Sequence, residues 1–161
     1  MCNKIIYKME GISLKETILY VNYIIDGILL TIQTKMIYEQ TNEDELQDIH
    51  YAINWKNDHF ISRASSITEG AVINLQNALP SNISVACCQS CRHGNFCPYG
   101  DQDNEIFCLK DMIFNNKSEV CDFFSENRNS LNSRSRRLLE FCTDYKPISH
   151  NEYYTYNDWM L

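Results

Sequence analysis

Apolar positions in the first third of the chain predict two strands joined by a tight turn. The β-branched, apolar runs VNYII (21–25) and ILLTI (28–32) lie on either side of Asp26-Gly27. A two-residue Asp-Gly connection favours a type I′ hairpin, because glycine adopts positive φ easily and aspartate tolerates it. Apolar residues occupy both faces of these runs, so we expect the hairpin to lie in the middle of an antiparallel sheet. NKIIYKM (3–9) predicts one more strand ahead of it.

The segment EDELQDIHYAINW (43–55) has the pattern of a short amphipathic helix. Leu46, Ile49 and Ile53 recur at near-helical spacing and would form one apolar face. Acidic residues crowd the first turn, and Asn42 is the predicted cap. We interpret His50 as a residue at the rim of that face rather than a ligand, because no second ligand is spaced to join it.

A second short helix is predicted over EGAVINLQNAL (69–79), with Thr68 as its cap and Pro80 directly after its end. Further strands are predicted at 59–67, 82–88 and 105–110, and a short helix at 136–142. Residues 125–137, rich in Ser, Asn and Arg, are expected to form a flexible polar loop. The aromatic tail EYYTYNDWML (152–161) is expected to pack as an edge strand or to occupy an interface.

Length and composition agree with one α+β domain spanning residues 1–161 of this 161-residue chain. We predict an antiparallel sheet, two short helices and a zinc-ribbon-like knuckle at 87–121. The N-terminus has no apolar run of signal-peptide length, and no stretch approaches the roughly 20 apolar residues of a membrane span. We therefore expect a cytoplasmic protein, in which clustered cysteines indicate metal rather than disulfides.

Six of the eight cysteines lie between Cys87 and Cys121. Cys88 and Cys91 form a C-x2-C pair, whose spacing lets two thiolates bind one tetrahedral ion. Two more soft ligands are then needed, and Cys108 and Cys121 are our choice. The expected cofactor is one structural zinc ion held by Cys88, Cys91, Cys108 and Cys121.

Several alternatives to this ligand set stay open. Cys97 could replace Cys121, and the resulting tighter set would also suit an iron–sulfur cluster. His93 could donate an imidazole, although it follows Cys91 closely in the same knuckle. Cys87 is expected to point away from the ion, because neighbours on an extended chain face opposite sides. Cys2 and Cys142 are expected to be buried or exposed thiols outside the site.

The run from Leu75 to Phe124 resembles an uncharacterised bacterial family of cysteine-containing domains. Its members share a C-x2-C pair, a following P-Y-G loop, a later cysteine before Phe or Leu, and a final cysteine before an aromatic residue. The motifs stand here at Cys88, Cys91, Pro98, Tyr99, Gly100, Cys108 and Cys121. The resemblance covers about a third of the chain and implies the same four ligands.

The sequence favours a non-enzymatic, zinc-stabilised interaction protein, with an immunity or antitoxin-like role as a special case. The formal net charge of −7 repels nucleic acid and favours a basic protein partner. One alternative is an enzyme, either a thiol redox protein using Cys88 and Cys91 or an unrecognised hydrolase. Another is a nucleic-acid-binding zinc ribbon, supported only by four arginines between Arg128 and Arg137.

Overall fold

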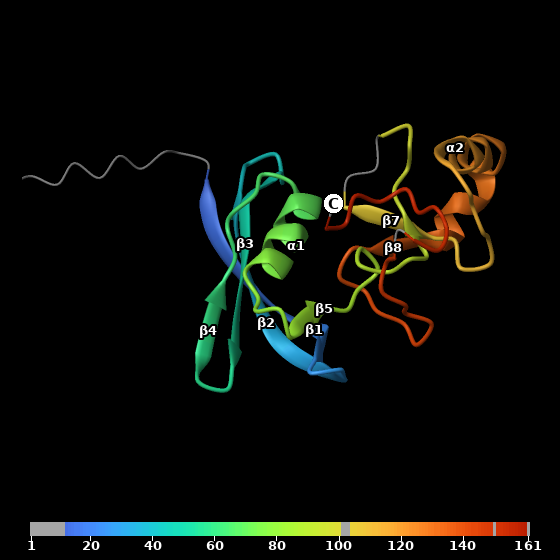
Figure 1. Cartoon of the computed structure of the whole chain (residues 1–161). Helices are drawn as coiled ribbons and strands as arrows, with labels where there is room; N and C mark the ends of the chain where they lie inside the picture. The colour runs from blue at the N-terminus through green and yellow to red at the C-terminus, as the bar shows by residue number, and fades with distance from the viewer. Residues whose placement is uncertain (1–11, 101–103, 150, 161) are drawn as a thin grey trace, which may run out of the picture.

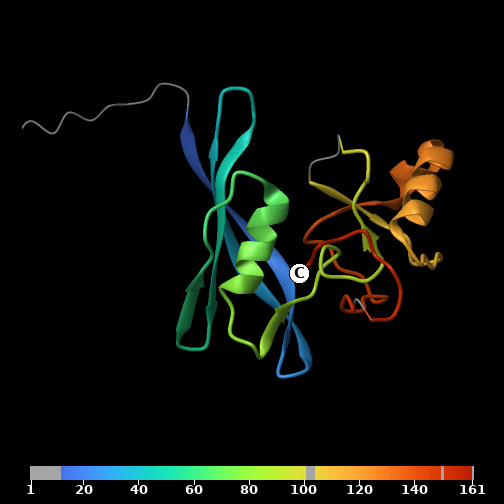
Figure 2. The ribbon, with the colours of Figure 1, turned by 45° about the horizontal axis from the view of Figure 1, so that its top comes forward.

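The computed structural model describes residues 12–100, 104–149 and 151–160, and these form an α+β fold. A five-stranded antiparallel sheet and a three-stranded sheet lie side by side, with helix α1 on the face of the larger sheet that looks toward the second half of the chain (Figure 1; Figure 2). The predicted α+β class with an antiparallel sheet is confirmed. The strand expected at 3–9 lies outside the described residues.

The larger sheet has the order β4-β3-β2-β1-β5. Its bounds are β1 Ser13–Ile25, β2 Ile28–Gln40, β3 Leu46–Trp55, β4 Asp58–Ile61 and β5 Ile83–Val85. The β1–β2 hairpin turns at Asp26 and Gly27, whose φ angles are 50° and 81°. Positive φ at both turn positions is the type I′ geometry, so the predicted hairpin and its central place in the sheet are confirmed.

Helix α1 (Thr68–Asn77) packs its buried residues Ala71, Val72 and Leu75 against the sheet. Gln76 at its end joins the helix to the edge strand β5. Its side-chain carbonyl accepts from the Val85 N–H at 2.8 Å, and its amide donates to the Ile83 carbonyl at 3.1 Å. The amide therefore hydrogen-bonds the backbone of a strand that is only three residues long.

The smaller sheet has the order β6-β7-β8, made of β6 Gly94–Asn95, β7 Glu105–Cys108 and β8 Ser135–Arg137. Helix α2 (Lys117–Glu126) and the 3-10 helix η1 (Arg128–Arg134) connect β7 to β8. Asn116 caps α2: its side chain accepts from the Glu119 N–H at 3.1 Å, while Glu119 accepts from the Asn115 N–H at 2.7 Å. These interactions join residues no more than four apart in the sequence, where Asn116 and Glu119 form the capping pattern N-x-x-E.

Two apolar cores stabilise the fold. The first lies between the larger sheet and α1 and also takes in Ile106, Leu138 and Trp159 from the second half. The second is built around β7 and α2, and its buried members are Phe107, Leu109, Phe114, Val120, Phe124 and Leu131. Residues of β7 enter both cores, which ties the two halves together.

Several predicted elements are corrected. The segment 43–55 is not a helix but contains strand β3, because Ile49, Tyr51 and Ile53 are buried at every second position. Thr41 closes the turn before it by accepting from the Glu43 and Glu45 N–H groups. The strand expected at 59–67 ends at Ile61, and Thr68 is the first residue of α1 rather than its cap.

The segments expected to be a polar loop and a third helix have other structures. Residues 125–137 form the end of α2, then η1 and β8. Ser130 and Ser133 donate to backbone carbonyls three residues earlier, which favours a tight helical turn over an open loop. Residues 136–142 are not helical, since the carbonyls of Leu138 and Glu140 accept from the N–H groups of Gln89 and Cys88.

Candidate metal centre

The C-x2-C knuckle is a tight turn whose backbone is hydrogen-bonded at both ends. The Cys91 N–H donates to the Cys88 carbonyl at 3.3 Å, and the Gly94 N–H donates to the Cys91 carbonyl at 2.9 Å. Gly94 is needed at this point, because a Cβ there would lie 2.3 Å from the Cys88 carbonyl oxygen. The knuckle is thus compact enough to bring Cys88 and Cys91 to one side of the turn, as a shared ion requires.

Strand β7 brings Cys108 next to the knuckle. Gly94 pairs with Cys108 in the β6–β7 ladder, and the Leu109 N–H donates to the His93 carbonyl at 2.8 Å. The backbone of Cys108 therefore lies directly across from the residue that closes the knuckle. This agrees with the prediction that 105–110 is a strand returning to the cysteine pair.

The loop after β8 forms the other side of the knuckle. The Cys88 N–H donates to the Glu140 carbonyl at 2.7 Å, and the Arg92 N–H donates to the Lys146 carbonyl at 2.9 Å. Cys142 lies between these two anchor points. The Tyr145 N–H donates to its carbonyl at 3.0 Å, so the loop turns at this cysteine.

The aromatic tail holds the knuckle from outside. Asn157 donates to the Gln89 carbonyl at 2.7 Å, and Thr155 donates to the Arg92 carbonyl at 2.8 Å. Trp159 is buried in the first core. The described part of the tail therefore packs on its own chain, not as the expected edge strand but through side-chain bonds to the knuckle and an isolated bridge between Tyr154 and Phe114.

The electrostatics of the knuckle thiols reflect burial and mutual closeness. Burial raises the pKa of Cys88, and the charges of Cys87, Cys91, Cys142 and Cys108 raise it further. The pKa of Cys91 is likewise raised, first by burial and then by Cys108 and Cys142, against hydrogen bonds that lower it. Without a cation these thiols stay protonated at neutral pH, and a bound cation would reverse that preference.

Cys87 belongs to the apolar core rather than to the knuckle surface. It is fully buried, and burial raises its pKa to about 11. Burial raises the pKa of the core tyrosines Tyr23 and Tyr51, and electrostatic interaction with Cys87 raises it further. Cys88 packs against the same core but is only partly buried, and the expectation that only Cys88 faces an ion stays a prediction.

Cys121 and Cys97 lie with the second core. Cys121 is on α2 between the buried Val120 and the aromatic pair Phe123 and Phe124, and its carbonyl accepts from the Tyr99 hydroxyl at 3.1 Å. Its charge contributes to the raised pKa of Tyr154, after burial and Tyr156. Cys97 packs against the same core. His93 faces a different group: its Nδ1 lies 3.3 Å from the Tyr153 hydroxyl, and burial lowers its pKa.

The structure therefore brings Cys88, Cys91 and Cys108 together, adds Cys142, and places Cys121 with other neighbours. Cys142 is the residue that sequence reasoning left out. Among residues 12–100, 104–149 and 151–160, no three His, Cys, Asp or Glu side chains are arranged so that they could hold a metal ion as they stand. The zinc-ribbon-like character of the knuckle stays a prediction.

A groove next to the knuckle has an apolar floor. It has a volume of about 720 Å³ and runs between the larger sheet and the loop after β8. Its apolar lining includes Leu19, Met36, Leu46, Leu138 and Phe141, and its charged lining consists of Glu105, Arg137 and Glu140. Leu46 is the first residue of β3 and directly follows a turn with three exposed carboxylates, Glu43, Asp44 and Glu45, while the exposed Asp48 lies two residues further along the strand.

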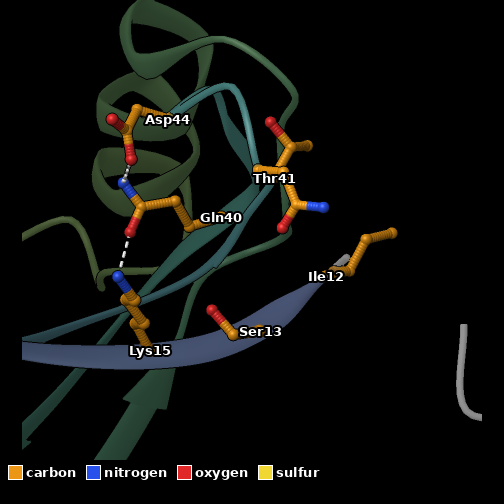
Figure 3. A pocket seen from close by; sticks show the side chains of 7 residues that line it. Ile12, Ser13, Lys15, Gln40, Thr41 and Asp44 are labelled. Carbon is orange, nitrogen blue, oxygen red and sulfur yellow. Dashed lines mark hydrogen bonds between the residues drawn. The ribbon is translucent and has the colours of Figure 1, made fainter. Parts of the chain in front are cut away.

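A smaller, polar hollow lies at the open end of the β1–β2 hairpin (Figure 3). Gln40 occupies its centre, where it accepts from Lys15 and donates to Asp44 at 3.2 Å. Its polar groups are already hydrogen-bonded to each other, so it offers few free groups to a ligand. No helix in the described part of the chain is long and apolar enough to cross a membrane.

Comparison of this chain with known protein families, with curated proteins and with solved structures gives no match. The resemblance to a family of cysteine-containing domains therefore stays a prediction.

Proposed function

We propose that this protein is a cytoplasmic, non-enzymatic interaction protein that binds a basic protein partner and whose knuckle is stabilised by zinc. The observation that carries the proposal is the apolar groove lined at one end by Leu46, the residue that directly follows the acidic turn of residues 43–45. An apolar floor supplies binding energy, and the carboxylates at its end favour a partner segment with basic side chains. An immunity or antitoxin-like role is one form that such binding would take.

The charge of the groove supports this choice of partner. Two carboxylates and one guanidinium line it, and Leu46 connects it to the turn that carries the exposed carboxylates of Glu43, Asp44 and Glu45. Nearer the knuckle, Asp111 is paired with Arg134 at 2.5 Å and Asp144 with Lys110 at 2.5 Å. We therefore place the negative charge that attracts the partner at the acidic turn rather than at the knuckle.

The alternatives have less support. A thiol redox enzyme needs a cysteine of low pKa, whereas burial raises the pKa of both Cys88 and Cys91. A nucleic-acid interface needs free cations, but Arg134 is paired with Asp111 and Arg136 donates to the carbonyls of Ser133 and Ser135.

A pull-down from the native cell at low and at high salt tests the proposal. The tagged chain should retain a protein of basic character whose binding weakens as salt rises. The double variant Glu43→Gln/Glu45→Gln should lose much of that retention at low salt. The control Asp122→Asn/Glu126→Gln removes two exposed charges from α2 and should leave it unchanged. Recovery of nucleic acid in place of a basic protein would refute the proposal. So would an equal loss of the retained protein by the two double variants.

A further inference from the structure

The strongest unassigned feature of the structure is the position of Cys142. Two hydrogen bonds, from the Cys88 N–H to the Glu140 carbonyl and from the Arg92 N–H to the Lys146 carbonyl, join two segments of the chain. The C-x2-C pair lies between these bonds on one segment, and Cys142 lies between them on the other. A third connection is the bridge between Cys91 and Pro147. These backbone contacts hold both ends of the loop that carries Cys142 against the knuckle.

A salt bridge joins the loops that carry Cys108 and Cys142. Lys110 lies two residues after Cys108, Asp144 lies two residues after Cys142, and their side chains pair at 2.5 Å. Cys108 is in turn held opposite Gly94 by the β6–β7 pairing. Three separate segments, the knuckle, β7 and the loop after β8, therefore present four cysteines to one region.

The electrostatics of the region agree with this arrangement. Electrostatic interaction with Cys108 and Cys142 raises the pKa of both knuckle thiols, Cys88 and Cys91, and also the pKa of Lys110.

We propose that the fourth ligand of the zinc ion is Cys142, so that the site consists of Cys88, Cys91, Cys108 and Cys142. This inference rests on the zinc part of the proposed function and replaces Cys121 in the predicted ligand set. Because the four side chains do not form a metal site as they stand, binding requires the thiols to change rotamer about the single bond that carries each sulfur. Binding forms four Zn–S bonds and releases the four thiol protons to solvent.

The exposure of Cys142 allows a test on the unaltered protein. Cys142 is exposed, so as a free thiol it should react quickly with iodoacetamide. In protein purified with zinc under reducing conditions, we expect Cys142 to be protected together with Cys88, Cys91 and Cys108. Peptide mapping by mass spectrometry reads each cysteine separately. Rapid labelling of Cys142 in protein that holds one zinc ion per chain would overturn the inference.

Two serine variants supply the matched comparison. Cys142→Ser should lower zinc affinity by at least about a hundredfold, the upper effect of losing an outer-shell partner of a metal site. Cys121→Ser should leave the zinc content at one ion per chain. Zinc lost from Cys121→Ser and kept by Cys142→Ser would restore the ligand set expected from the sequence. Where either variant folds poorly, the labelling of the unaltered chain decides between the two sets.

Failure of the inference can be told apart from failure of the proposed function. Unaltered protein that takes up no zinc on reconstitution refutes the metal site with either ligand set. The salt-dependent capture of a basic partner is measured independently and depends on the acidic turn rather than on Cys142. Partner binding can therefore persist when the ligand assignment fails, and the ligand assignment can hold when no partner is found.

Discussion

Replacing Gly94 by alanine should destabilise the protein through the knuckle. A Cβ at this position would lie 2.3 Å from the Cys88 carbonyl oxygen and 2.8 Å from Ile106 Cδ1, where contacts under 3.0 Å essentially never occur. The Cys88 oxygen cannot simply move aside, because it accepts the Cys91 N–H that closes the knuckle. Overpacking against backbone typically costs 1–3 kcal/mol, and we expect about 3 kcal/mol here.

Thermal unfolding measures this loss of stability. In a chain of this length each kcal/mol shifts Tm by roughly 2–4 °C, so we expect a fall of about 6–12 °C. Gly70→Ala is the matched control: its Cβ meets a serine side chain, Ser65 Oγ at 2.7 Å, and the helix gains propensity of about 1 kcal/mol. A Gly94→Ala protein that melts within about 2 °C of the wild type would refute the reasoning.

The remaining predictions concern the second core, one ion pair, the tail and the metal. Phe124→Ala should cost about 3–5 kcal/mol in urea unfolding, because a fully buried ring is removed, and an unchanged urea midpoint would contradict this. Arg134 lowers the pKa of Asp111 from 3.8 to about 2. The pair therefore stabilises the fold above pH 3.8, and this stability is lost as pH falls toward 2. Because Asp111 is largely exposed, the effect should stay below about 1 kcal/mol, and Arg134→Gln should abolish it in urea midpoints compared at pH 5 and pH 2. Asn157→Ala removes bonds to the Gln89 and Gly94 carbonyls and should cost about 1–3 kcal/mol, with faster hydrogen exchange at the knuckle. Metal analysis should find one zinc ion per chain, and Cys91→Ser should lose it and order the second half poorly, whereas a brown protein would indicate an iron–sulfur cluster.

Local turn chemistry explains why part of the fold was predictable. The β1–β2 hairpin depends on two adjacent residues, Asp26 and Gly27, which adopt the positive φ angles that the turn requires. Helix α1 was predicted over residues 69–79, directly before Pro80, and the structure forms it at Thr68–Asn77 with Val72 and Leu75 buried. In both cases the determining residues lie close together in the sequence, so the local sequence pattern is enough to predict the element.

Strand β3 was mispredicted because two periods fit the same residues. Leu46, Ile49 and Ile53 fit a helix, whereas Ile49, Tyr51 and Ile53 fit a strand, and the structure buries the second set. The pairing of β3 with β2, which includes a register shift between Ile37 and Glu39, decides between them. That pairing is a long-range contact, so it overrides the weak helical preference of the segment.

The candidate site was predictable only in part, for a related reason. The C-x2-C spacing identifies Cys88 and Cys91 because their shared geometry is local. Cys108 was found from the strand around it. Cys142 reaches the knuckle through backbone bonds from Glu140 and Lys146, and no sequence spacing encodes these. Cys121 was chosen with Cys108 as one of the two further soft ligands, but it lies on helix α2, whose neighbouring residues Val120 and Phe124 are buried in the second core.

The distribution of apolar residues gives a physical reason for a cation at the knuckle. The two apolar cores lie on either side of it, and the knuckle itself contributes mainly cysteines and polar residues. Its order depends on hydrogen bonds to the loop after β8 and to the tail, each of which is worth only about 1 kcal/mol net. A structural zinc ion contributes about 10–16 kcal/mol of apparent binding energy at neutral pH. Because burial raises the pKa of these thiols, the proposed ion would both charge the knuckle and stabilise it, and it would couple the order of the second half to metal supply.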